Sequence, residues 1–159
     1  MKKPEFLSAV RNGHKEFLKS FEGMSHDSMV EPGVVGNWSV KDTVSHVSMW
    51  KAEAIRVLYY VEQDDKPPKI YAGKDIDQIN DEWYQNTVSR TVEQVMADYQ
   101  GVSKQLLKRL EDLPDDHWEN PEGSVQISGE LVTTFIADNS FDHEAEHAAE
   151  IRKWRERCK

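Results

Sequence analysis

The sequence has one cysteine, no long apolar run and no basic cluster, and each absence excludes a class of protein. Because Cys158 is the single cysteine, no internal disulfide can form. The longest mostly apolar stretch, LVTTFIA at residues 131–137, is far too short to span a bilayer. The first residues, MKKPEFLSAV, contain no apolar run of signal-peptide length. These features predict a cytoplasmic protein with no membrane partner.

Positive charge is also scarce. The 159 residues contain 29 aspartates and glutamates against 20 lysines and arginines, which gives a net charge of −9. Nucleic-acid binding usually requires a basic face, and anionic membranes attract basic surfaces for the same reason. We therefore expect no nucleic-acid partner. No Ser–His–Asp set, glycine-rich phosphate loop or paired-carboxylate motif stands out, so the common catalytic signatures do not assign an activity.

Helical periodicity dominates what is present. The length, with no repeat and no linker, predicts a single domain over residues 1–159. Capping boxes mark the starts of two helices, with Ser39 before Asp42 and Thr91 before Gln94. Four long amphipathic helices and one short one predict an all-α, up-and-down four-helix bundle. The long helices are expected to start at Pro4, at Ser39, at about Thr91 and at about Ser128. The last of them is expected to run to Arg157, and the short helix to span 75–87.

The final predicted helix carries polar side chains on its apolar face. When each residue turns the helix by about 100°, four polar residues fall within about 60° of the apolar Val132: Asn139, His143, His147 and Glu150. Burying polar groups costs a few kcal/mol unless they find partners. This polar row, between apolar turns at both ends, therefore needs a partner from another helix.

His46, at the flank of the second helix's apolar face, is a candidate partner. Three imidazoles from two helices suit one divalent metal ion, with a fourth position open for water or substrate. Alternatively the histidines only complete the core, since two histidines four residues apart are common on helices. His14, on the apolar face of the first helix, is expected to be a hydrogen-bonded core residue.

Two carboxylates lie one helical turn from these histidines and are candidate catalytic residues. Glu150 follows His147 and Asp42 precedes His46, so each could orient an imidazole or move a proton. The simpler interpretations are that Asp42 caps its helix and that Glu150 is a charge at the edge of the groove between helices.

Two stretches, NWSVKDTVSHVSMW (37–50) and FDHEAEHAAEIRKW (141–154), resemble the DinB-like superfamily, also called DinB/YfiT-like, of four-helix bundles. The similarity is greatest to the ClbS/DfsB-type branch and includes DQINDEWY at 77–84. In metal-bearing relatives the ligands stand at the positions of His46, His143 and His147. The resemblance implies a divalent metal such as zinc or nickel, in some relatives a low-molecular-weight thiol, and often a homodimer.

The resemblance also implies a function. One ClbS-type relative protects its producer by hydrolysing a reactive cyclopropane, and other relatives transfer or isomerise with a thiol. We therefore expect a metal-dependent hydrolase or thiol S-transferase that acts on a small electrophilic molecule in detoxification or self-protection. The alternatives are a bundle that binds or sequesters a small molecule, or a metal-independent ClbS-like hydrolase in which the histidines are structural.

Overall fold

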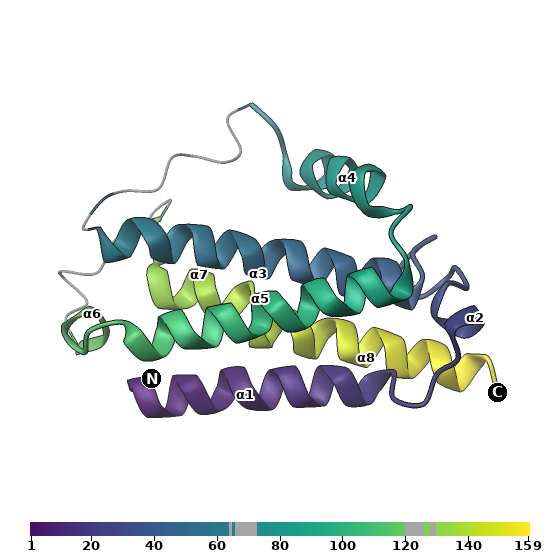
Figure 1. Ribbon diagram of the computed structural model, residues 1–159, viewed down its shortest axis with the longest axis horizontal. Coiled ribbons are helices and arrows are strands. Elements are labelled where there is room, and N and C mark those ends of the chain that lie inside the picture. The colour runs from purple at the N-terminus through teal and green to yellow at the C-terminus, as the bar shows by residue number, and fades with distance from the viewer. Residues whose placement is uncertain (64, 66–72, 120–125, 128–129) are drawn as a thin grey trace.

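Four long helices form a bundle in the computed structural model, which describes residues 1–63, 65, 73–119, 126–127 and 130–159 (Figure 1). The long helices are α1 (Lys3–Ser20), α3 (Val40–Glu62), α5 (Val92–Asp112) and α8 (Phe141–Arg157). A shorter helix, α4 (Ile76–Thr87), packs outside the bundle against α3. The predicted all-α four-helix bundle with one short extra helix is confirmed. No helix in the described ranges is long and apolar enough to cross a membrane.

Several short elements connect the long helices. These are α2 (His26–Met29), α6 (Asp116–Glu119), α7 (Val132–Asp138) and two two-residue strands, β1 (Gln126–Ile127) and β2 (Glu130–Leu131). The strands pair antiparallel, with Gln126 opposite Leu131 and Ile127 opposite Glu130. The predicted start of the last helix at Ser128 lies outside the described residues.

The prediction of one continuous final helix is wrong. The chain leaves helical geometry between α7 and α8, where Ser140 has φ −133° and ψ −104°. Asn139 Nδ2 donates to Phe135 O at 2.7 Å, and Ser140 Oγ donates to Ile136 O at 2.5 Å. Phe135 O also accepts from Asn139 N at 3.1 Å, whereas Ser140 Oγ supplies the bond that Ile136 O lacks from the backbone, because Ser140 N donates to Ala137 O. Asn139 therefore caps α7 and does not belong to an inward polar row.

The helix directions also differ from a strictly alternating, up-and-down order. Arg109, late in α5, pairs with Glu62, the last residue of α3, at 2.7 Å, so α3 and α5 run parallel. Arg152, late in α8, lies 3.4 Å from Glu16, late in α1, so these two helices are also parallel. The order is up-down-down-up. The long crossover that contains α4 returns the chain to the end at which α3 begins, which a short loop could not do (Figure 1).

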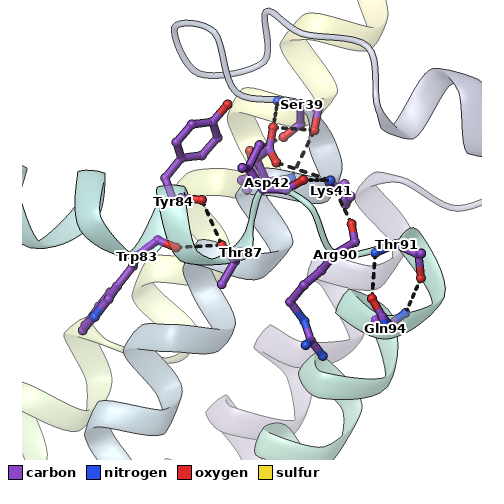
Figure 2. Close-up of polar contacts among 11 residues, drawn as sticks. Ser39, Lys41, Asp42, Trp83, Tyr84, Thr87, Arg90, Thr91 and Gln94 are labelled. Carbon is purple, nitrogen blue, oxygen red and sulfur yellow. Dashed lines mark hydrogen bonds and ion pairs between the residues drawn. The ribbon is translucent and has the colours of Figure 1, made fainter.

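Both predicted capping boxes are present (Figure 2). At the start of α3, Ser39 Oγ accepts from Asp42 N at 3.1 Å, and Asp42 Oδ2 accepts from Ser39 N at 3.0 Å. At the start of α5, Thr91 Oγ1 accepts from Gln94 N at 3.2 Å, and Gln94 Oε1 accepts from Thr91 N at 3.0 Å. Such caps stabilise helix starts and fix where α3 and α5 begin.

A buried lysine attaches the turn between α4 and α5 to α3. Lys41 Nζ donates to Val88 O at 2.6 Å and to Arg90 O at 3.0 Å (Figure 2). The ammonium thereby satisfies two loop carbonyls that would otherwise lack partners. This contact holds the end of α4 over the first turns of α3.

The apolar core consists of two clusters, one toward each end of the bundle. One includes Phe17, Val44, Val47, Tyr99 and Ile151, and the other includes Phe6, Val10, Leu58, Leu106 and Ile136. Between them, at the middle of the helices, buried polar side chains replace apolar ones: Lys51 from α3, Ser103 from α5 and Glu144 from α8. The site described next lies at this level of the bundle.

Candidate metal centre

The three predicted histidines converge between α3 and α8. His46 comes from α3, and His143 and His147 lie one turn apart on α8. His143 Nε2 is 3.0 Å from His46 Nε2 and 2.9 Å from His147 Nε2. One ring nitrogen from each residue lies within 4.8 Å of the other two. Residues four apart on a helix share a face, which explains why His143 and His147 meet.

The close packing of α1 on α8 fixes where the first turn of α8 lies. A Cβ atom at Gly13 of α1 would lie 2.6 Å from Phe141 Cβ, so any larger residue would push the two helices apart. Phe141 is the first residue of α8, and His143 follows within the same turn. The absence of a side chain at Gly13 therefore helps to position the histidine pair.

Burial and mutual proximity keep two of the imidazoles neutral. Burial first, and then the neighbouring His143 and His147, lower the pKa of His46 to about 2. Burial, His147 and the Lys51 ammonium lower the pKa of His143 to about 3. A neutral imidazole offers a lone pair, which is the form that ligates metals.

Glu150 contacts the third histidine. Its Oε2 lies 2.6 Å from His147 Nδ1, and the His147 side chain is almost fully buried. A proton on Nδ1 donated to this carboxylate leaves Nε2 free to face the other two rings. His143 Nδ1, by contrast, is buried without a hydrogen-bond partner among the described residues.

Asp42 lies beside the centre and not within it. Its Oδ2 accepts from both the amide and the hydroxyl of Ser39, at 3.0 and 2.8 Å, as a helix cap. It also lines a narrow pocket of about 10 Å³ next to His46, which is room for about one water molecule. Trp83 and Tyr84 of α4 also line this pocket, and Figure 2 shows Tyr84 near Asp42.

A buried polar network below the histidines escaped the sequence analysis. Lys51 Nζ donates to Ser103 Oγ at 2.9 Å and forms an ion pair with Glu144 Oε1. Tyr99 OH donates to the same carboxylate oxygen and lies 3.0 Å from His14 Nδ1, so the predicted hydrogen bond of His14 is present, although His14 is only half-buried. Burial raises the pKa of Glu144 and lowers the pKa of Lys51, and the attraction between the two charges opposes both shifts.

A signal for this network was present in the sequence. Lys51 is eleven residues after Val40, so at about 100° per residue it falls about 20° from the centre of the apolar face of α3. A lysine at that position must bury its ammonium or distort the packing. An acidic partner from another helix was therefore to be expected.

The donor set fits a divalent metal. Three imidazole nitrogens face one point, and one of these rings is oriented by a carboxylate. Two nitrogens that each lie about 2.0 Å from a tetrahedral ion are separated by about 3.3 Å. The Nε2 separations of 2.9 and 3.0 Å are close to this value.

The fold and the histidine cluster together define a class, that of all-α bundles with a candidate metal centre between two helices. The sequence profile of the DinB superfamily matches residues 9–151, so the chain belongs to the DinB superfamily. This finding confirms the resemblance noted in the sequence. A comparison with curated proteins gives no match.

Several solved structures share the fold, and they include ClbS and DfsB. An uncharacterised protein from Escherichia coli UTI89 superposes with a TM-score of 0.82 at 18% identity, over 98% of this chain and 94% of that chain. The colibactin self-resistance protein ClbS, in complex with double-stranded DNA, gives 0.78 at 17% identity, over 95% and 93%. The sibling lethal factor precursor DfsB gives 0.80 at 12% identity, over 100% and 98%. Identities this low show a common fold alone.

Proposed function

We propose that the protein is a metal-dependent enzyme that acts on a small electrophilic molecule through His46, His143 and His147. The observation that carries this proposal is the convergence of three Nε2 atoms from two helices, with Glu150 on the outer nitrogen of one ring. The ligand set suits zinc or nickel. Such an ion, when bound, supplies a Lewis acid with a coordination position open to the substrate.

The chain's own residues have distinct proposed roles. Glu150 is a positioning residue, because it holds the His147 ring with Nε2 toward the other histidines. Asp42 is the proposed proton acceptor, because its carboxylate lines the pocket beside His46. Trp83 and Tyr84 of α4 cover that pocket and limit the access of bulk water.

The proposed reaction is hydrolysis of the electrophile or transfer of a low-molecular-weight thiol to it. A role in detoxification or self-protection is supported by the shared fold with ClbS, which is described as a colibactin self-resistance protein. That protein was solved with double-stranded DNA. For this chain the net charge of −9 opposes binding to a polyanion, so we propose a small-molecule substrate and no nucleic-acid partner. We also propose that the protein acts in the cytoplasm as a homodimer.

One observation favours a second candidate function. The Nε2 atoms lie within hydrogen-bond distance of one another, so N–H···N bonds between neutral rings could satisfy them without a metal. The chain would then be a bundle that binds or sequesters a small molecule, or a metal-independent ClbS-like hydrolase with structural histidines.

A reaction screen separates these functions. Wild type and His143→Ala, each loaded with zinc or nickel and each treated with a chelator, are incubated with iodoacetamide, styrene oxide and 1-chloro-2,4-dinitrobenzene, with and without a thiol. The proposal expects metal-loaded wild type to form product faster than a protein-free control, and the other samples to match the rate of that control. Turnover that survives both chelation and His143→Ala would support the metal-independent hydrolase instead.

A further inference from the structure

A groove between α3 and α5 is large enough to hold a small molecule. Its volume is about 410 Å³, whereas the pocket beside His46 encloses about 10 Å³. Ligand sites in proteins commonly have volumes of about 300–1,000 Å³. The groove therefore has room for the body of a ligand, while the pocket admits only a group about the size of a water molecule.

The groove adjoins the candidate metal centre. Met49 of α3 and Thr87 of α4 line both the groove and the pocket beside His46. Met49 lies one turn after His46 on α3, and its unbranched side chain adapts easily to a neighbouring group. A molecule lying in the groove could thus extend past Met49 and Thr87 to His46.

The side chains along the groove disfavour an anion. Neither the groove nor the adjoining pocket is lined by a lysine or an arginine, but each contains a carboxylate, Asp98 and Asp42 respectively. The Ser48 hydroxyl donates to Val44 O at 2.8 Å, within its own helix. Met49, Ala52 and Val95 supply apolar surface. This lining suits an uncharged molecule, because no lysine or arginine lines the groove to attract an anion, and Asp98 already pairs with Arg90 at 2.5 Å.

Gly101 leaves part of the groove open without any structural need for a glycine. It lies inside α5, where glycine weakens a helix relative to alanine. A Cβ atom added at Gly101 would have no heavy atom within 4 Å, in contrast to Gly13, where one would clash with α8. Packing within the chain therefore does not explain Gly101, which lines the groove where a larger side chain would find open space.

We propose that the groove between α3 and α5 binds the unreactive body of the substrate, an uncharged molecule. The reacting end passes Met49 and Thr87 into the pocket beside His46. The groove as a binding site rests on its own volume and lining. The identity of the reacting end rests on the proposed function.

Two dyes that differ by one sulfonate test the groove. N-phenyl-1-naphthylamine is uncharged, and 8-anilinonaphthalene-1-sulfonate carries the same rings with a negative charge. We expect the uncharged dye to bind wild type at least about tenfold more tightly than the sulfonate, because the lining carries no cation. Gly101→Leu should weaken binding of the uncharged dye by at least about tenfold, because its side chain occupies the groove. Lys104→Leu, which places a leucine on α5 outside the groove lining, should bind like wild type.

Melting curves verify that both variants fold, and Gly101→Leu should not melt below wild type, since leucine is the better helix former. Three results would each overturn the proposal. The first is that wild type does not bind the uncharged dye at all, and the second is that it binds both dyes equally. The third is an equal loss of affinity for the uncharged dye in Gly101→Leu and Lys104→Leu. All titrations are repeated after chelation. Dye binding that persists in metal-free protein supports the groove even if the metal-dependent function fails.

Discussion

Lys51 and Glu144 form an ion pair in the middle of the bundle, where neither side chain has any exposure to solvent. The pair lies between two apolar clusters and is supported by Ser103 and Tyr99. Removing two charges from water is costly, and only their mutual attraction and further hydrogen bonds offset that cost. The pair therefore ties α3 to α8 beneath the histidines that these same helices contribute.

Breaking this pair should destabilise the protein strongly. Lys51→Met leaves the Glu144 carboxylate buried without its cation, and we expect a loss of about 3–5 kcal/mol in the free energy of unfolding. The double variant Lys51→Met/Glu144→Leu should recover much of this loss, because no charge is then buried alone. Urea unfolding measures both values. Lys108→Met, which breaks the exposed pair with Asp112, is the matched control and should change stability little, because solvent screens an exposed pair. A Lys51→Met variant no less stable than this control would contradict the account.

Glu150→Gln should weaken metal binding without unfolding the bundle. Loss of the carboxylate leaves the His147 ring less firmly oriented, and changes of this kind typically reduce metal affinity by about 10–100-fold. Competition with a chromophoric chelator measures the affinity for zinc. Glu146→Gln, at an exposed position on the same helix, should leave the affinity unchanged. Equal affinities for the two variants would show that the contact between Glu150 and His147 does not matter for metal.

Metal-free protein should lose stability as the pH falls below about 6.5. The pKa of His46 is lowered to about 2 and that of His143 to about 3 from an ordinary value of 6.5. Between these limits the unfolded chain binds protons that the folded chain does not, so acid favours unfolding. Two such residues contribute a loss of about 3 kcal/mol between pH 7.5 and pH 5.5.

Urea midpoints across this pH range, measured in the presence of a chelator, provide the check. His143→Gln should flatten the pH dependence, whereas His26→Gln, at an exposed histidine, should not. A wild-type stability independent of pH over this range would show that the histidines are not buried as neutral groups.

We expect a homodimer, because the resemblance to the DinB-like superfamily implies one. Sedimentation equilibrium at micromolar concentration should then give twice the chain mass of 18.4 kDa. A single species at the chain mass over that concentration range would argue for a monomer.

Periodicity and caps were sufficient to predict the four long helices, the short α4 and the placement of the histidines on α3 and α8. They could not reveal the break between α7 and α8, because Asn139 and Ser140 fit a helical pattern and end α7 only through bonds to its own carbonyls. The relative directions of the helices could not be predicted either, because they depend on the end of the bundle to which the crossover returns.

The prediction that His143 and His147 face inward was based on angles counted along one continuous final helix. A continuous helix from Val132 does not exist, so angles counted from that residue do not carry into α8. His143 and His147 share a face because they are four residues apart within α8 itself. Glu144, beside His143 in sequence, is more buried than His143 and was missed because its partner Lys51 was not recognised.

The metal content of the purified protein tests the central claim most directly. Elemental analysis of wild type, His143→Ala and His147→Ala is performed beside their melting curves. The account predicts near-stoichiometric zinc or nickel in wild type and little in either variant, since two remaining protein ligands hold zinc poorly. Both variants should still fold, because most of the core lies in the two apolar clusters away from the histidines. Wild type that contains no metal, and takes up none after incubation with zinc and nickel, would contradict the account.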